Sequence, residues 1–305
     1  MSKISESETC PITGKPGRSL RTRQPEELFQ AYNDYCKFPL TPELKQKYFT
    51  HPVTEYFCKT SGLRWYSPCH LGESDFYERL SSFPHYYNPG SWDKLEALQI
   101  LLEIGGESAV DVGCGDGWLV REAMKAGMKM IGTDLNAAAI ANAKKEGLSV
   151  YHPADIEAQN RHVDTLVSLQ TLEHVHHPVI WLQAQIEQFK PNHLILAVPA
   201  HDTMLGRTME PLCWPPHHYT QWSAQAMHSL AEKIGFKVVR MAYEPNDWRR
   251  FNGILNRERR RCLDGTPTFP KGRRGALLFW LLSLLRVPWV SRAHTLLVVL
   301  KRIPT

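Results

Sequence analysis

The amino-acid sequence predicts an α/β fold, in which a parallel sheet alternates with helices and a smaller N-terminal lobe precedes it. Short apolar runs recur after residue 100, each long enough for one buried strand. Helical patterns follow most of these runs, and such βα alternation implies parallel strands joined by right-handed crossovers. A chain of 305 residues allows one domain with additions, or two.

The stretch from Ser108 to Leu119 (SAVDVGCGDGWL) predicts the first strand, a turn and the start of a helix. Its apolar run contains Asp111, and a buried carboxylate is costly unless something specific binds it. Three glycines follow at alternate positions, Gly113, Gly115 and Gly117. Glycines between a strand and a helix let the backbone approach a ligand closely, so this turn predicts a nucleotide-type binding loop.

The spacing of the glycines separates two kinds of ligand. A dinucleotide fingerprint, G-x-G-x-x-G, would need a third glycine where Trp118 stands. The pattern Asp-x-Gly-x-Gly-x-Gly instead resembles motif I of the class I S-adenosylmethionine-dependent methyltransferases. The resemblance implies that the loop holds the methionine part of this cofactor, whose ammonium group would explain Asp111.

Three further matches follow in the order of that family. The strand Met128 to Asp134 ends in an acid that can accept the ribose hydroxyls. Leu148 to Tyr151 predicts a third strand, and Val163 to Gln170 a fourth, which runs into TLEHVHHP, a segment similar to motif IV. The resemblance implies cofactor contacts at Asp111, Gly113, Cys114, Gly115, Gly117, Asp134, Leu135, Asp155, Ile156 and Gln170.

The remaining elements complete a seven-stranded sheet. The pattern predicts helices at 117–126, 137–146 and 222–235 and strands at 193–199, 237–243 and 294–301. The resemblance implies a Rossmann-like, mostly parallel sheet with helices on both faces, and a last strand inserted antiparallel between the fifth and sixth. Residues 91–305 would form this methyltransferase domain, with an insertion at 245–293.

Residues 1–90 predict a separate small lobe with helices at Pro25–Cys36 and Thr41–Phe49. The fragments CPITGK and FCKTSGLRWYSP resemble two zinc-knuckle halves, but Thr13 and Ser61 replace the second cysteine of each half. Because a neutral hydroxyl is a poor zinc ligand, we expect a degenerate lobe and no metal. Seven scattered cysteines and a polar N-terminus without an apolar signal core predict free thiols and a cytoplasmic location.

Candidate catalytic residues should gather at the carboxyl ends of the strands. They are Glu173, in the motif IV segment, and His217 and His218, in WPPHHYTQW. The second segment resembles a family sequence, P-P-H-H-L-x-x-W, that faces the acceptor pocket. Either histidine could act as a base or orient the acceptor, since a neutral imidazole works near pH 7. In the other interpretation, the histidines cap a helix and hydrogen-bond the backbone.

The function predicted by this resemblance is methyl transfer from S-adenosylmethionine to a small-molecule or lipid- or glycan-linked acceptor, with oxygen as the expected target. The resemblance is closest to the group that includes quinone-biosynthesis O-methyltransferases and polysaccharide-cluster methyltransferases. The alternative is a non-catalytic protein that binds S-adenosylmethionine as a scaffold. A nicotinamide-dependent oxidoreductase is disfavoured by Trp118.

The insertion carries most of the positive charge, with nine basic residues against two acids between Trp248 and Gly275. The apolar run Ala276 to Leu285 follows; at ten residues it is too short to span a bilayer. It predicts either a lid on the catalytic domain or a peripheral contact with the inner membrane surface through residues 248–292. No nucleic-acid-binding module is recognisable, so no specific nucleic acid is expected.

Overall fold

The structure is a computed structural model of the chain. It describes residues 8–36, 40–81, 90–156, 162–203, 211–249, 251–252, 272–285 and 287–304.

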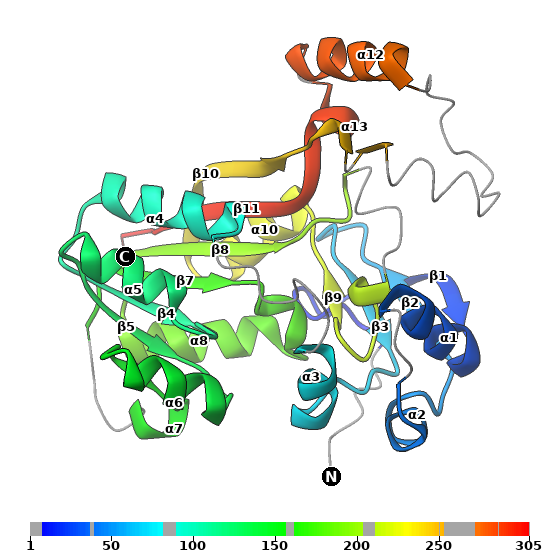
Figure 1. The fold of residues 1–305 in the computed structure, drawn as a ribbon, viewed down its shortest axis with the longest axis horizontal. Helices are drawn as coiled ribbons and strands as arrows, with labels where there is room; N and C mark the ends of the chain where they lie inside the picture. Colours follow the sequence, from blue (N-terminus) through cyan, green and yellow to red (C-terminus); the bar gives the residue numbers. More distant parts are fainter. Residues whose placement is uncertain are drawn as a thin grey trace.

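The larger of two sheets has seven strands in the order β10-β11-β8-β7-β4-β5-β6 (Figure 1). The strands are β4 (Ser108–Val112), β5 (Lys129–Thr133), β6 (Val150–Tyr151), β7 (Thr165–Leu169), β8 (His193–Pro199), β10 (Phe236–Pro245) and β11 (Arg292–Arg302). Neighbours from β6 to β8 pair in parallel, whereas β11 lies antiparallel between β8 and β10. The predicted α/β fold, with its antiparallel last strand, is confirmed.

Helices cover both faces of this sheet (Figure 1). Alternate strand residues point to opposite faces, and they belong to two separate hydrophobic clusters. In β8, Leu194 and Leu196 share a cluster with α8 and α10, while Ile195 and Ala197 share one with α4, α5 and α6. The helices are α4 (Trp92–Ile104), α5 (Trp118–Lys125), α6 (Ala137–Lys145), α7 (Pro153–Ile156), η1 (Leu172–His174), α8 (Pro178–Phe189), η2 (Pro211–Cys213) and α10 (Ala224–Lys233).

The N-terminal part forms a second sheet of four antiparallel strands, β1-β2-β3-β9. Its elements are β1 (Arg18–Arg23), α1 (Pro25–Cys36), α2 (Pro42–Tyr48), β2 (Val53–Phe57), β3 (Arg64–Ser67) and α3 (Ser74–Ser81), together with β9 (Thr220–Gln221). The strand β9 belongs to the chain far beyond residue 90, so the methyltransferase region completes the sheet of the lobe. One hydrophobic cluster also contains residues of both parts. The division at residue 90 stays a prediction.

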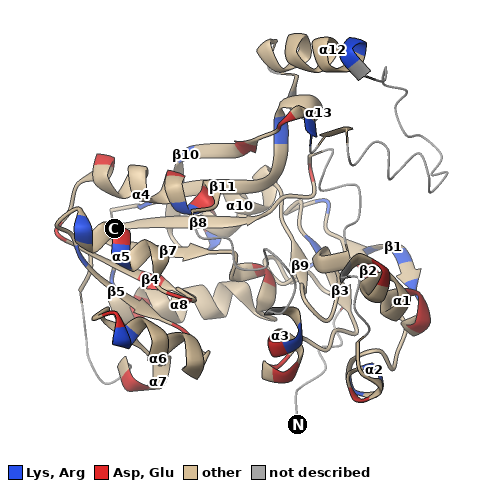
Figure 2. Cartoon of the chain, viewed as in Figure 1, with Lys and Arg blue, Asp and Glu red and all other residues tan. Residues whose placement is uncertain are grey.

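The described residues between β10 and β11 include the helices α12 (Gly272–Leu284) and α13 (Pro288–Ser291). The inner side of α12 packs Phe279 against Phe251 and Val290 in a small cluster of its own. The helix stands apart from the sheet in Figure 1, and its basic residues lie at its start in Figure 2. Among the described helices, none has both the length and the apolar character needed to cross a membrane. Residues 253–271, with much of the predicted basic segment, lie outside the described residues.

Candidate active site

The glycine turn after β4 lies against the end of the neighbouring strand β5. The backbone N–H groups of Gly113 and Cys114 both donate to the carbonyl of Thr133, at 2.8 and 3.0 Å. A side chain at Gly113 would collide with Thr171, because its Cβ would lie 2.4 Å from the Thr171 hydroxyl. At Gly115, in contrast, a Cβ would meet nothing within 4 Å. The turn is therefore packed at its start and open at its middle.

Asp111 and Asp134 lie on opposite sides of this turn. Asp111 is 4% exposed, and its Oδ1 atom has no hydrogen-bond partner among the described residues. Burial raises the pKa of its carboxyl group to about 7. The Oδ2 atom of Asp134 accepts a hydrogen bond from the Gly115 N–H at 2.7 Å, which ties the second strand to the loop. Each carboxylate oxygen of Asp134 keeps a further lone pair for a ligand.

The other predicted cofactor residues differ in their surroundings. Leu135, next to Asp134, is an apolar side chain that is 77% exposed, and Asp155 is exposed on α7. Ile156 is buried in the hydrophobic core, and Cys114 is buried where it would contact any side chain at Gly132. Of these four predicted cofactor residues, Leu135 and Asp155 are therefore exposed, whereas Cys114 and Ile156 are buried.

Gln170 connects the site to a residue that the sequence did not single out. It has a positive φ of 53° at the end of β7, and its side-chain amide donates to Asp93 at 3.1 Å. Asp93 is 5% exposed, and its charge is one of the causes that raise the pKa of Asp111. In the sequence Asp93 is simply an acid in the first turn of a helix, where acids are common. Its burial was the missing signal.

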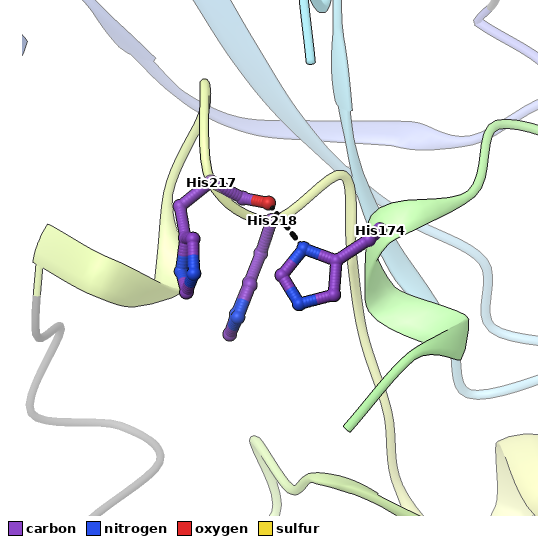
Figure 3. Close-up of side chains that lie close together, drawn as sticks. All are labelled: His174, His217 and His218. Carbon is purple, nitrogen blue, oxygen red and sulfur yellow. Dashed lines mark hydrogen bonds between the residues drawn. The ribbon is translucent and has the colours of Figure 1, made fainter. Parts of the chain in front are cut away.

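The three candidate catalytic residues are brought together with a fourth, His174. Glu173 and His174 come from η1, directly after β7, while His217 and His218 come from the loop before β9 (Figure 3). Ligating atoms of the three histidines all lie within 4.8 Å of one another. The Oε1 atom of Glu173 is 4.0 Å from the Nε2 atoms of both His174 and His218. We refer to these four side chains as the histidine–glutamate cluster.

Burial controls the charge of the cluster. Glu173 is 0% exposed, and desolvation raises the pKa of its carboxyl group to about 8. Desolvation lowers the pKa of His174 to about 4 and that of His217 to about 3, and it holds the pKa of His218 well below its ordinary value. All three imidazoles are therefore neutral at physiological pH.

Backbone carbonyls fix the orientation of two of these rings. The Nδ1 atom of His174 lies 2.8 Å from the His217 carbonyl, and the Nδ1 atom of His217 lies 2.7 Å from the Leu212 carbonyl. Tyr77, which the sequence reasoning did not select, also reaches His174 with its hydroxyl at 2.9 Å. The ring of another histidine, His201, does not belong to this cluster. Its Nε2 atom lies 2.9 Å from the Gly62 carbonyl and so links the two parts of the chain.

The four zinc-knuckle positions of the N-terminal lobe lie together as two mixed pairs. The thiol of Cys10 is 3.2 Å from the Ser61 hydroxyl, and the thiol of Cys58 is 3.6 Å from the Thr13 hydroxyl. Thr13 and Ser61 thus form hydrogen bonds with the two cysteines, at the positions where the resembled zinc-knuckle halves have their second cysteines. Among the described residues, no disulfide is formed by Cys10, Cys58, Cys69, Cys114 or Cys213.

A hollow of about 520 Å³ lies at the amino ends of β4 and β5, lined by residues such as Ser108, Lys129 and Ser149. This is the edge of the sheet opposite the glycine turn and the histidine–glutamate cluster. In open α/β sheets ligands bind at the carboxyl ends of the strands. We therefore do not assign the hollow to the active site.

Comparison with known proteins agrees with the geometry. The ubiquinone biosynthesis O-methyltransferase of Nitrosococcus oceani is 32% identical over 107 residues, an alignment that covers 32% of this chain and 45% of that protein. The enzyme of the same description from Nitrosospira multiformis is 34% identical over 97 residues, covering 29% and 41%. The chain thus spans less than half the length of the curated relatives it matches.

Solved structures with a similar fold include an S-adenosylmethionine-dependent methyltransferase from Archaeoglobus fulgidus, with 15% identity and a TM-score of 0.47 over 68% of this chain and 94% of that chain. Another is a magnesium protoporphyrin IX methyltransferase from Synechocystis with bound S-adenosylmethionine, with 15% identity and a TM-score of 0.42 over 69% and 78%.

A family model described as a methyltransferase domain matches residues 89–241, half of the chain. The match covers the glycine turn, the acids that follow it and the histidine–glutamate cluster. It confirms the resemblance to the S-adenosylmethionine-dependent methyltransferases that the motifs predicted, and the chain belongs to the methyltransferase domain family.

Proposed function

We propose that this protein transfers a methyl group from S-adenosylmethionine to an oxygen atom of a small-molecule acceptor. The observation that carries the proposal is the buried Asp111 carboxyl group beside an open glycine turn, with no hydrogen-bond partner for one of its oxygens among the described residues. A buried acid of this kind is stabilised by a cationic ligand. The O-methyltransferases that share about a third of their aligned residues with this chain support oxygen as the target.

The residues at the carboxyl edge of the sheet fit the cofactor. Asp111 would balance the ammonium group of the methionine part, and the open face at Gly115 leaves room for it. Asp134 keeps free lone pairs for the ribose hydroxyls, and the exposed Leu135 can pack on the adenine ring. When bound, the cofactor supplies an electrophilic methyl group. The chain's part is then to position the acceptor and to receive its proton.

The histidine–glutamate cluster supports the acceptor side of the proposal. His217 and His218 are neutral and stacked, with ring centroids 4.3 Å apart, at the carboxyl end of the sheet where acceptors gather. They would orient an acceptor hydroxyl and receive its proton, with Glu173 buried behind them. The other interpretation, in which the histidines cap a helix and hydrogen-bond the backbone, agrees with the contact between the His217 ring and the Leu212 carbonyl in η2, so turnover of the variants has to separate the two roles.

The proposal is tested by separating cofactor binding from turnover. His217→Ala and His218→Ala should each lower methyl transfer by about 10²–10⁴-fold, the usual contribution of a positioned acid or base. The affinity for S-adenosylmethionine, measured by calorimetry, should stay within about twofold because the change touches only the acceptor side. Equal losses of both quantities would show that the two histidines are structural. Binding without transfer to any acceptor in a panel of phenols and cell extract would favour the scaffold alternative.

We also propose that the acceptor is lipid-linked and that α12 brings the protein to the surface of a membrane. One side of this helix exposes large apolar side chains, Leu277 (63%), Trp280 (59%), Leu281 (49%) and Leu284 (78%), and Leu285 (74%) directly follows the helix. Arg273 and Arg274 are exposed at its start (Figure 2). Apolar side chains next to basic ones match the boundary between acyl chains and anionic headgroups. A lid would instead cover these side chains with protein.

A further inference from the structure

The histidine–glutamate cluster contains buried polar atoms that have no hydrogen-bond partner among the described residues. Neither oxygen of the fully buried Glu173 carboxylate has a hydrogen-bond partner among the described residues, and the same holds for Nδ1 of His218. Leaving a carboxyl group buried in this way costs several kcal/mol as a rough figure. The Nε2 atom of His218 is also 4.0 Å from Glu173 Oε1, too far for a hydrogen bond, so both side chains lack a partner that the described residues do not supply.

The orientation of the rings indicates what that partner is. A carbonyl oxygen can only accept a hydrogen bond, so Nδ1 of both His174 and His217 carries the proton. Their Nε2 atoms are then the lone-pair nitrogens. A ring N–H that donates to a backbone carbonyl is typical of metal-ligating histidines, which bind the ion through their other nitrogen.

We propose that the cluster binds a divalent transition-metal ion of the zinc type, with His174, His217 and His218 as nitrogen ligands and Glu173 as the balancing carboxylate. Nitrogen ligands of one tetrahedral ion lie about 3.4 Å apart, given bonds of about 2.1 Å. The three histidines lie within 4.8 Å of one another, so small side-chain rotations close the site. From the sequence no metal is expected here, because no second cluster has clear ligand spacing and the family resemblance accounts for Glu173 and His174 without an ion.

The chemical environment also selects the kind of ion. Three imidazoles and one carboxylate favour zinc, iron, cobalt or manganese over calcium and magnesium, which prefer oxygen ligands. With their lone pairs on such an ion, His217 and His218 would no longer receive the acceptor's proton, and the ion would take over this part by lowering the pKa of a hydroxyl group bound to it. This consequence for the acceptor rests on the proposed function, whereas binding of the ion does not.

The test uses the full chain, stripped with chelator and then titrated with Co²⁺ and Zn²⁺. The wild type should bind about one equivalent, with a visible Co²⁺ spectrum that lacks thiolate charge-transfer bands. His218→Asn and Glu173→Gln should weaken binding by more than about tenfold, the least that loss of even an outer partner costs at such sites. His177→Asn is the matched control, because His177 is exposed on the same segment and lies outside the cluster.

Several results would overturn the site. They are no binding by a folded wild type, binding unchanged in His218→Asn, or thiolate bands that disappear in Cys58→Ser and so place the ion at the N-terminal cysteines. Circular dichroism checks that each variant is folded. Calorimetry with S-adenosylmethionine, run on the metal-free protein, keeps failure of the metal site distinct from failure of the methyltransferase proposal.

Discussion

Asp111 and Asp134 show how single residues at the end of a strand acquire different properties from their surroundings. In the sequence Asp111 interrupts an apolar run, whereas Asp134 ends one. The fold buries Asp111 inside β4, whereas Asp134 stays partly exposed and accepts two backbone hydrogen bonds, from Gly115 and Asn136. One is thus suited to a cation and the other to hydroxyl groups.

The pKa of Asp111 leads to a prediction about stability. It is about 7 in the folded chain against an ordinary value of 3.8, so the folded state retains a proton that the unfolded chain releases. The free energy of unfolding should therefore fall as the pH rises from about 4 to about 7. Asp111→Asn should remove that part of the decline and be more stable at pH 8, by up to about 4 kcal/mol, while binding S-adenosylmethionine more weakly.

Urea unfolding of the cofactor-free protein between pH 4 and pH 8 measures this effect. Asp116→Asn is the control, because Asp116 lies in the same turn but is exposed. If Asp111→Asn showed the same pH dependence as the wild type, the carboxyl group would not be titrating as its burial requires.

A second residue-scale prediction concerns Asp134. Asp134→Ala removes a charged acceptor for the ribose and should weaken binding of S-adenosylmethionine by about 1.5–3 kcal/mol. Asn136→Ala is the control. It removes the N-cap of α6, which accepts from Ala138 and Ala139, and so costs about 1 kcal/mol of stability without touching the ligand. Calorimetric affinities that are equal in Asp134→Ala and the wild type would refute the assigned role.

At the scale of elements, α12 carries the most exposed apolar surface described in the chain's insertion. The helix keeps Phe279 inside its small cluster and leaves Trp280 and Leu284 outside. An amphipathic arrangement of this kind needs a second surface to cover it. Its sequence alone, apolar on nearly every side, did not indicate which side would be free.

We expect the wild type to sediment with anionic vesicles at low salt, where screening is weakest. The double change Trp280→Ser and Leu284→Ser should reduce the bound fraction strongly, because each large apolar side chain contributes about 1.5–3 kcal/mol on burial. Leu95→Ser is the matched control, since Leu95 is 52% exposed on α4. Absence of sedimentation by the wild type would leave the lid interpretation in place.

At the scale of the whole molecule, the N-terminal lobe holds the loop that carries His217 and His218. Tyr32 in α1 donates a hydrogen bond of 2.6 Å to the Trp214 carbonyl, which also accepts from the N–H groups of both histidines. The short strand β9 continues this contact by pairing with β3. The lobe therefore positions the acceptor side of the site rather than standing beside it.

Tyr32→Phe tests this arrangement. Losing one buried hydrogen bond should cost about 1 kcal/mol of stability and lower methyl transfer, with the affinity for S-adenosylmethionine unchanged. Tyr56→Phe is the control in the same lobe, because the Tyr56 hydroxyl donates an exposed hydrogen bond to the Glu8 carboxylate. Unaltered turnover in a measurably destabilised Tyr32→Phe protein would show that the lobe does not position the loop.

The sequence by itself determined the order of strands, the glycine turn and the acids at the strand ends. These are local features: an apolar run of period two or an Asp-x-Gly pattern depends on neighbouring residues alone. The β8 strand at His193–Pro199 was predicted in this way and is confirmed. The antiparallel course of β11 was implied by the family resemblance, and it is also confirmed. The family match confirms the resemblance that the turn carried.

Only the tertiary structure decided what meets at the carboxyl edge of the sheet. His174 and His217 are 43 residues apart, and no local pattern predicts that the His174 ring contacts the His217 backbone carbonyl. Asp93 in α4 and Tyr77 in α3 lie at the site for the same reason, although the sequences of these helices look like ordinary surface segments. Burial then raised the pKa of Glu173 above that of an exposed acid. Burial depends on the whole fold, so the spacing of residues in the sequence does not predict it.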